Sequence, residues 1–184
     1  CLLSRGLGDV YKRQDGIPAS YESLFPKHAE ALHETCDISD FIWSYGYMLM
    51  ATGDVKWADK MESAVYNAAL GAINKDFKAL QYFSSPNQLL ATEKSSMAPY
   101  GEEGLSRQAY RPGFDVECCS GNVHRMFPNY ISRMWMNGDE HEIVAALYGP
   151  SEYRTEINGT KVCITEDTSY PVSYTHLTLP TNSL

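Results

Sequence analysis

The sequence predicts a mainly helical protein with a β-rich C-terminal part. Up to residue 137, apolar residues recur at helical spacing in three segments, whereas after Gly138 they follow the pattern of short strands. An Asn158-Gly159 pair between two alternating stretches is typical of a β-hairpin turn. Hydrophobic residues make up 43% of the chain and aromatic residues 12%, which is enough for a packed core.

The two terminal segments of the chain are excluded from this fold prediction. Residues 4–14 and 172–177 can be encoded by DNA strings that are partly reverse complements of each other, which unrelated protein segments would not show. Both strings resemble transposase-type sequencing adapters that have been translated. We therefore expect residues 1–14 and 171–184 to be adapter-like artefacts. Residues 15–170 are then expected to be an internal piece of a longer protein.

The charge of the chain argues against binding to nucleic acid or to membranes. The formal net charge is −8. The first fourteen residues carry three basic side chains and one acidic one, so the remainder carries −10. Such a chain has no electrostatic attraction to polyanions. No apolar run approaches the roughly 20 residues that a membrane span needs. An acidic, aromatic-rich chain is compatible with a neutral polar ligand such as a sugar.

A pair of helices is predicted after a proline-containing loop at residues 15–33. The first helix begins near Asp37 and ends at Gly53, and Asp54 is placed to cap the second. The inward-facing residues of the first helix are expected to be Ile38, Phe41, Ile42, Tyr45 and Leu49. Those of the second are expected to be Trp57, Met61, Ala64, Val65, Ala68 and Ala72. The short link between them predicts an αα-hairpin.

Residues 79–84 are expected to form a short strand before a turn at residues 85–87. Residues 89–116 have no period and are predicted to be a long loop, which in a compact domain is usually functional or disordered. A third helix is expected to start from a Ser120 cap and to end near Asn137, with a kink or break at Pro128. Its inward residues are expected to be Val123, Met126, Phe127, Tyr130, Ile131 and Met134.

Strands are predicted at residues 143–147, 153–157 and 160–165. A turn at Gly149-Pro150 and a type I′ turn at Asn158-Gly159 would connect them. Asn158-Gly159-Thr160 also matches a glycosylation sequon, but a tight hairpin turn explains these residues better. A β domain is therefore expected to follow the helical part.

Four residues offer a complete set of ligands for a tetrahedral zinc ion: Glu34, Cys36, Cys118 and Cys119. No Cys-x-x-Cys occurs, so a zinc ribbon or thioredoxin-like motif does not fit. The three cysteines lie near predicted helix N-termini, where the partial positive charge stabilises thiolates and lowers their pKa. The alternative is that the cysteines simply fill core space.

The cysteine pattern is not a disulfide framework. Cys118 and Cys119 are adjacent, and adjacent cysteines rarely bond each other. Reduced thiols favour a cytoplasmic location, while a periplasmic or secreted location stays open because the expected true N-terminus is missing.

Five motifs, in order, resemble glycoside hydrolase family 127, the β-L-arabinofuranosidase-like proteins that were long known only as a domain of unknown function. They are residues 33–36 (HETC), 66–71 (YNAALG), 82–87 (YFSSPN), 118–125 (CCSGNVHR) and 146–151 (ALYGPS). The resemblance implies that residues 15–137 are the C-terminal piece of an (α/α)6 barrel. Residues 138–170 would then begin a β-sandwich.

The resemblance also implies chemistry. Zinc would be held by Glu34, Cys36, Cys118 and Cys119, and Cys118 would be the nucleophile that forms a thioglycosyl intermediate with net retention. A separate Glu would act as acid and then as base. In the family this Glu lies sixteen residues before the first zinc ligand, a position that falls on Pro18 here. The nearest substitute is Glu22, which could equally be a solvated loop carboxylate.

Other candidate residues stay open. Glu30 is a weaker candidate for the acid, because it lies on the approach to Glu34. His124 and Arg125 follow the cysteine pair and could line a pocket, form supporting hydrogen bonds or make a surface ion pair.

Two functions follow from this sequence. The first is a retaining glycosidase of the β-L-arabinofuranosidase type with Zn²⁺ as cofactor and a carbohydrate as substrate. The alternative is a non-catalytic, zinc-stabilised carbohydrate-binding protein, because four protein ligands close a tetrahedral site in the manner of structural zinc.

Overall fold

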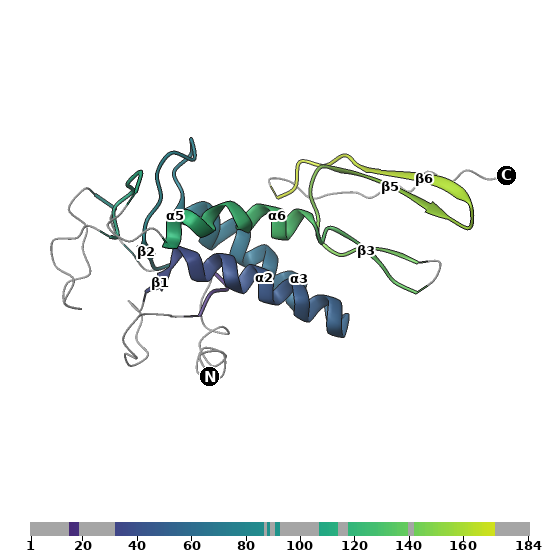
Figure 1. Cartoon of the computed structure of the whole chain (residues 1–184), viewed down its shortest axis with the longest axis horizontal. Helices are drawn as coiled ribbons and strands as arrows, with labels where there is room; N and C mark the ends of the chain where they lie inside the picture. Colours follow the sequence, from purple (N-terminus) through teal and green to yellow (C-terminus); the bar gives the residue numbers. More distant parts are fainter. Residues whose placement is uncertain are drawn as a thin grey trace. The chain divides into compact units, whose positions relative to one another are not determined.

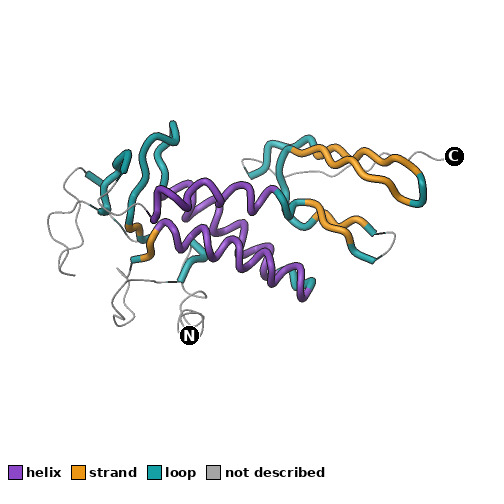
Figure 2. Tube along the Cα trace, viewed as in Figure 1, coloured by secondary structure: helices purple, strands orange, loops and turns teal. Residues whose placement is uncertain are grey.

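The computed structural model describes residues 15–18, 32–86, 88, 91–92, 107–113, 118–139 and 142–171. It combines helices with small two-stranded sheets (Figures 1 and 2). The chain divides into two compact units, Cys1–Tyr130 and Ile131–Leu184, which we describe one at a time. No helix among the described residues is long and apolar enough to cross a membrane.

The first predicted helix is confirmed as α2 (Thr35–Thr52). Ile38, Ile42 and Leu49 are buried along one face, as the apolar spacing indicated. Gly53 ends the helix in the left-handed conformation with a φ of 64°, and its N–H donates to the Leu49 carbonyl at 2.8 Å. A residue with a side chain is strained at such a φ, so glycine suits this position.

The second predicted helix runs through α3 (Lys56–Ser63), a π-helical turn η1 (Ala64–Ala69) and α4 (Leu70–Ala72). The N-cap residue of α3 is Val55 rather than the expected Asp54, although the Asp54 carboxylate accepts a hydrogen bond from the Lys56 N–H at 3.0 Å. The predicted stripe from Met61 to Ala72 is buried, and the Trp57 ring stacks on Tyr45 with centroids 5.8 Å apart. The π turn was not predicted. In Figure 1, α2 and α3 lie side by side as a hairpin.

A two-residue sheet forms beside the start of α2. Strand β1 (His33–Glu34) pairs antiparallel with β2 (Phe83–Ser84), so only the end of the strand expected at residues 79–84 enters a ladder. The N–H groups of Tyr82 and Phe83 both donate to the Arg107 carbonyl at 2.9 Å. Residues 107–113 of the predicted long loop therefore pack against residues 80–83.

The third predicted helix is shorter than expected and is broken. It comprises α5 (Cys118–Asn122), a 3₁₀ turn η2 (Val123–Arg125) and α6 (Met126–Ile131). The break lies at Val123–Arg125 and not at Pro128 as expected, since Pro128 is the third residue of α6. Proline has no N–H to donate to the carbonyl four residues before it, that of His124 in the 3₁₀ turn. The expected Ser120 cap is wrong, since the helix already begins at Cys118. The inward assignment of Ile131 is also wrong, because this side chain is 62% exposed.

The described residues of the second unit form two hairpins. Strand β3 (Trp135–Asn137) pairs with β4 (Ile143–Ala145), so the helix expected to continue to Asn137 gives way to a strand. Strand β5 (Ser151–Ile157) pairs with β6 (Thr160–Glu166). Asn158 and Gly159 have φ values of 51° and 77°, which confirms the type I′ turn. The rings of Trp135 and Tyr153 stack with centroids 5.7 Å apart.

Candidate metal centre

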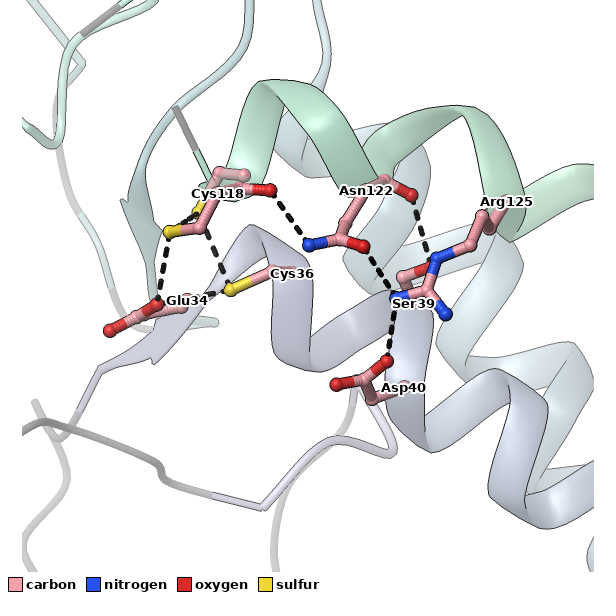
Figure 3. A network of polar contacts seen from close by, with 8 residues as sticks. Glu34, Cys36, Ser39, Asp40, Cys118, Asn122 and Arg125 are labelled. Carbon is pink, nitrogen blue, oxygen red and sulfur yellow. Dashed lines mark hydrogen bonds and ion pairs between the residues drawn. The ribbon is translucent and has the colours of Figure 1, made fainter. Parts of the chain in front are cut away.

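Glu34, Cys36, Cys118 and Cys119 come together in the structure, although two of them lie more than eighty residues after the others. One ligand atom from each lies within 4.8 Å of all the rest. Cys36 Sγ lies 3.0 Å from Glu34 Oε2 and 3.6 Å from Cys119 Sγ. Cys118 Sγ lies 3.9 Å from Glu34 Oε2 and 4.0 Å from Cys119 Sγ (Figure 3).

Two chain segments present these donors. Glu34 is both the last residue of β1 and the residue that caps α2, and its N–H donates to the Asp37 carboxylate at 3.3 Å. The next N–H, that of Thr35, donates to the Tyr82 carbonyl at 2.9 Å, which ties the helix start to β2. Cys36 follows in the first turn of α2. The other two sulfurs lie at the start of α5.

The spacing of the donors fits a tetrahedral metal site. Zinc–sulfur bonds of about 2.3 Å at tetrahedral angles place neighbouring sulfurs about 3.8 Å apart. The sulfur–sulfur distances of 3.6 and 4.0 Å lie on either side of this value. They are far longer than a disulfide bond of about 2.05 Å, and the four cysteines in the described residues are free thiols. The cluster could therefore hold a metal ion, and its donor set is compatible with zinc.

The thiols affect one another's ionisation. The hydrogen bond with Cys119 and then burial raise the pKa of Cys36, and burial is the main cause that raises the pKa of Cys118. The hydrogen bond between Cys119 and Cys36 is the main cause that lowers the pKa of Cys119. The predicted lowering of all three thiol pKa values is therefore wrong for Cys36 and Cys118. Like charges this close disfavour one another, and a bound cation would relieve that repulsion.

A tyrosine contributes a further polar contact to the centre. The Tyr82 hydroxyl lies 3.1 Å from Cys118 Sγ, and burial followed by this hydrogen bond raises the pKa of Tyr82. The Arg107 guanidinium lies over the Tyr82 ring, 4.6 Å from its centroid. No role was predicted for either residue, because their contacts with the site depend on how the loop packs.

The comparison with protein families decides the assignment. Residues 17–132 match the family described as Beta-L-arabinofuranosidase, GH127 catalytic domain. The chain belongs to this family. The GH127 match includes all four residues of the metal-ligand cluster.

Solved structures agree at the level of the fold. A GH127 β-L-arabinofuranosidase from Geobacillus stearothermophilus T6 is 24% identical, with a TM-score of 0.67 over 90% of this chain and 27% of that one. A GH127 β-arabinofuranosidase is 21% identical, with a TM-score of 0.65 over 85% of this chain and 23% of that one. The chain thus spans about a quarter of each. A comparison with curated proteins gives no match.

Of the other candidate site residues, the structure describes His124 and Arg125 but not the two glutamates. Glu22 and Glu30, the candidate acids, lie outside the described residues. His124 is exposed, whereas Arg125 donates to Asp40 Oδ1 at 2.7 Å and to Asn122 Oδ1 at 2.6 Å. The interpretation of Arg125 as a residue of an ion pair and a supporting hydrogen bond is therefore the one the structure bears out. Asn122 was missed, although it follows Cys118 at helical i+4 spacing.

Proposed function

We propose that the full-length protein is a retaining glycoside hydrolase that acts on β-L-arabinofuranosides or related glycosides. In this proposal Glu34, Cys36, Cys118 and Cys119 bind Zn²⁺, and Cys118 is the nucleophile. The observation that carries it is the approach of one carboxylate and three sulfurs to within 4.8 Å of one another in a GH127 chain. Glycosidases of this family act on carbohydrates, and we extend that substrate class to this protein.

The proposal includes the architecture around the site. We assign residues 15–137 to part of an (α/α)6 barrel and residues 138–170 to the start of a β-sandwich. The likeness in fold to much longer GH127 structures supports this, because the helices described here would then be part of a larger array.

The residues of this chain account for a double-displacement reaction. Zinc, when bound, supplies the positive charge that keeps coordinating thiols deprotonated. Cys118 Sγ attacks the anomeric carbon as the bond to the leaving oxygen breaks, and a glutamic acid gives that oxygen its proton. The glutamate then takes a proton from water, whose oxygen displaces the Cys118 thiolate. Two inversions give net retention. We assign the glutamic acid to Glu22.

A second candidate is a non-catalytic carbohydrate-binding protein in which zinc joins α2 to α5. The observation that favours it is the number of protein donors. Four donors complete a tetrahedral shell, which is typical of structural rather than catalytic zinc.

One set of measurements separates the two. We expect the full-length protein to hydrolyse p-nitrophenyl β-L-arabinofuranoside and to release β-L-arabinose first, as seen by proton NMR. Acid quenching followed by mass spectrometry should find a glycosyl adduct on the peptide containing Cys118. Cys118→Ser should lose activity by about 10⁴-fold or more, whereas Cys163→Ser, which alters an exposed thiol on β6, should not. Binding of arabinosides without any hydrolysis would favour the second candidate.

A further inference from the structure

A polar network lies beside the cysteines and joins the same two elements that carry the metal-ligand cluster. Figure 3 shows it running from Asp40 on α2 through Arg125 and Asn122 to the main chain of Cys118. We propose that Asn122, oriented by Arg125, is a positioning residue that holds Cys118 at the distances a tetrahedral metal requires. This inference rests on the metal centre of the proposed function.

Asn122 fixes the main chain of Cys118 directly. Its Nδ2 donates to the Cys118 carbonyl oxygen at 2.8 Å. Because α5 is only five residues long and passes into a 3₁₀ turn, its carbonyls have few regular helical partners. The main-chain carbonyl of Asn122 accepts a hydrogen bond from Ser39 Oγ at 3.1 Å, so Asn122 also contacts α2.

Arg125 determines which way the amide of Asn122 faces. Arginine carries only donors, so the atom of Asn122 that lies 2.6 Å from Arg125 must be the oxygen. The amide nitrogen is then directed to the Cys118 carbonyl. The guanidinium is itself held by Asp40 at 2.7 Å and by the Trp43 ring, whose centroid is 5.5 Å away. An exposed Arg–Asp pair alone is worth little, but here it orients a half-buried amide.

The network lies one helical turn behind the donors on both elements. Ser39 and Asp40 follow Cys36 by three and four residues on α2, and Asn122 follows Cys118 by four residues. The donors of the cluster therefore lie at the starts of α2 and α5, and the network joins these two helices one turn further along each. A shift of α5 along α2 would move the Cys118 and Cys119 sulfurs away from Glu34 and Cys36 together. Holding both elements in register is thus a requirement of the site.

The test uses the full-length protein loaded with Co²⁺. Thiolate-to-cobalt charge-transfer bands report sulfur ligation, and the d–d bands report tetrahedral geometry. Asn122→Ala and Asn122→Asp should each weaken metal affinity about 10–100-fold in chelator competition and change the d–d bands. Asn122→Asp is the sharper variant, because it keeps the bond to Arg125 but replaces the donor to the Cys118 carbonyl with an acceptor. Arg125→Lys should have an intermediate effect.

The matched control is Arg154→Ala, which breaks an exposed 2.7 Å ion pair with Glu152 on β5 and should leave the cobalt spectrum unchanged. If the wild type shows a tetrahedral thiolate spectrum and both Asn122 variants keep its affinity and bands, the positioning role is wrong while the metal centre stands. If the wild type shows no thiolate ligation, the metal centre and the positioning role both fall. Circular dichroism of each variant separates loss of folding from loss of register.

Discussion

The Tyr82 hydroxyl lies 3.1 Å from Cys118 Sγ, so the sulfur to which we assign nucleophilic attack has a hydrogen-bond partner outside the metal-ligand cluster. Tyr82 is itself well anchored. Its N–H donates to the Arg107 carbonyl, its carbonyl accepts from the Thr35 N–H, and the Arg107 guanidinium covers its ring. Because these contacts fix the position of Tyr82, its hydroxyl can hold the Cys118 thiolate in one orientation.

Tyr82→Phe should lower kcat about 10-fold, because the hydroxyl fixes the direction of Cys118 Sγ and misplacement of a reacting atom by about 1 Å can cost up to about 100-fold in rate. Metal content should not change, since the hydroxyl is not one of the four donors. Steady-state kinetics with metal analysis of the same sample checks both statements. Tyr47→Phe, which alters an exposed tyrosine on α2, is the control. An unchanged kcat would show that the contact has no part in the reaction.

If the cluster binds Zn²⁺ as we propose, removal of that ion should destabilise the protein. A chelator is expected to lower Tm and added Zn²⁺ to restore it, because a ligand at a hundredfold excess over its Kd stabilises the folded state by about 2.7 kcal/mol. Cys36→Ser should abolish most of this zinc-dependent gain, since it removes one of three sulfurs. Differential scanning fluorimetry with and without zinc measures the effect, with Cys163→Ser as the control. Equal zinc-dependent shifts in wild type and Cys36→Ser would contradict the ligand assignment.

The features that sequence predicted well are those decided by local geometry. The buried face of α2 follows from apolar residues at helical spacing, and Gly53 and Gly159 stand where φ is positive. The end of the third helix could not be found in this way. Trp135 continues a helical apolar pattern, yet it pairs with Ala145 in a strand, and that partner lies outside any local window.

The residues of the site also fall into two groups, those that the sequence indicates and those that only the folded chain reveals. Residue type and spacing alone indicated the four donors of the site only weakly, and the family resemblance of the flanking motifs strengthened the assignment. Tyr82 and Arg125 are not residue types that indicate a metal site. Tyr82 reaches Cys118 across 36 residues of sequence and Arg125 reaches Asp40 across 85, so only the packing of the chain reveals these contacts.

The stability of the helical hairpin should depend on pH through Glu62 on α3. Burial, and then the nearby Asp59, raise the pKa of Glu62 in the folded state. The unfolded value is about 4.3, so the folded protein binds this proton more tightly. The stability that Glu62 contributes is therefore full below pH 4 and is lost as pH rises through the folded pKa. Glu62→Gln removes the ionisation and so should be more stable than wild type near pH 7.

The gain should be only about a few tenths of a kcal/mol, because Glu62 is only partly buried and solvent screens its charge. Urea midpoints of wild type and Glu62→Gln at pH 7 and below pH 4 measure it. The two proteins should converge at the acidic end. A gain that is equal at both pH values would mean that the substitution acts through packing rather than through charge.

Gly159 should be the residue on which the β5–β6 hairpin most depends. Its φ of 77° lies in the left-handed region, where a residue with a side chain costs about 1 kcal/mol. Gly159→Ala should therefore speed hydrogen exchange of the amides that pair β5 with β6 several-fold, as measured by mass spectrometry. Gly71→Ala is the matched control, because Gly71 is helical and an added Cβ there meets no atom within 4 Å. That variant should leave the hairpin amides unchanged and favour its own helix slightly, so faster exchange in both proteins would indicate a global effect of alanine rather than strain at the turn.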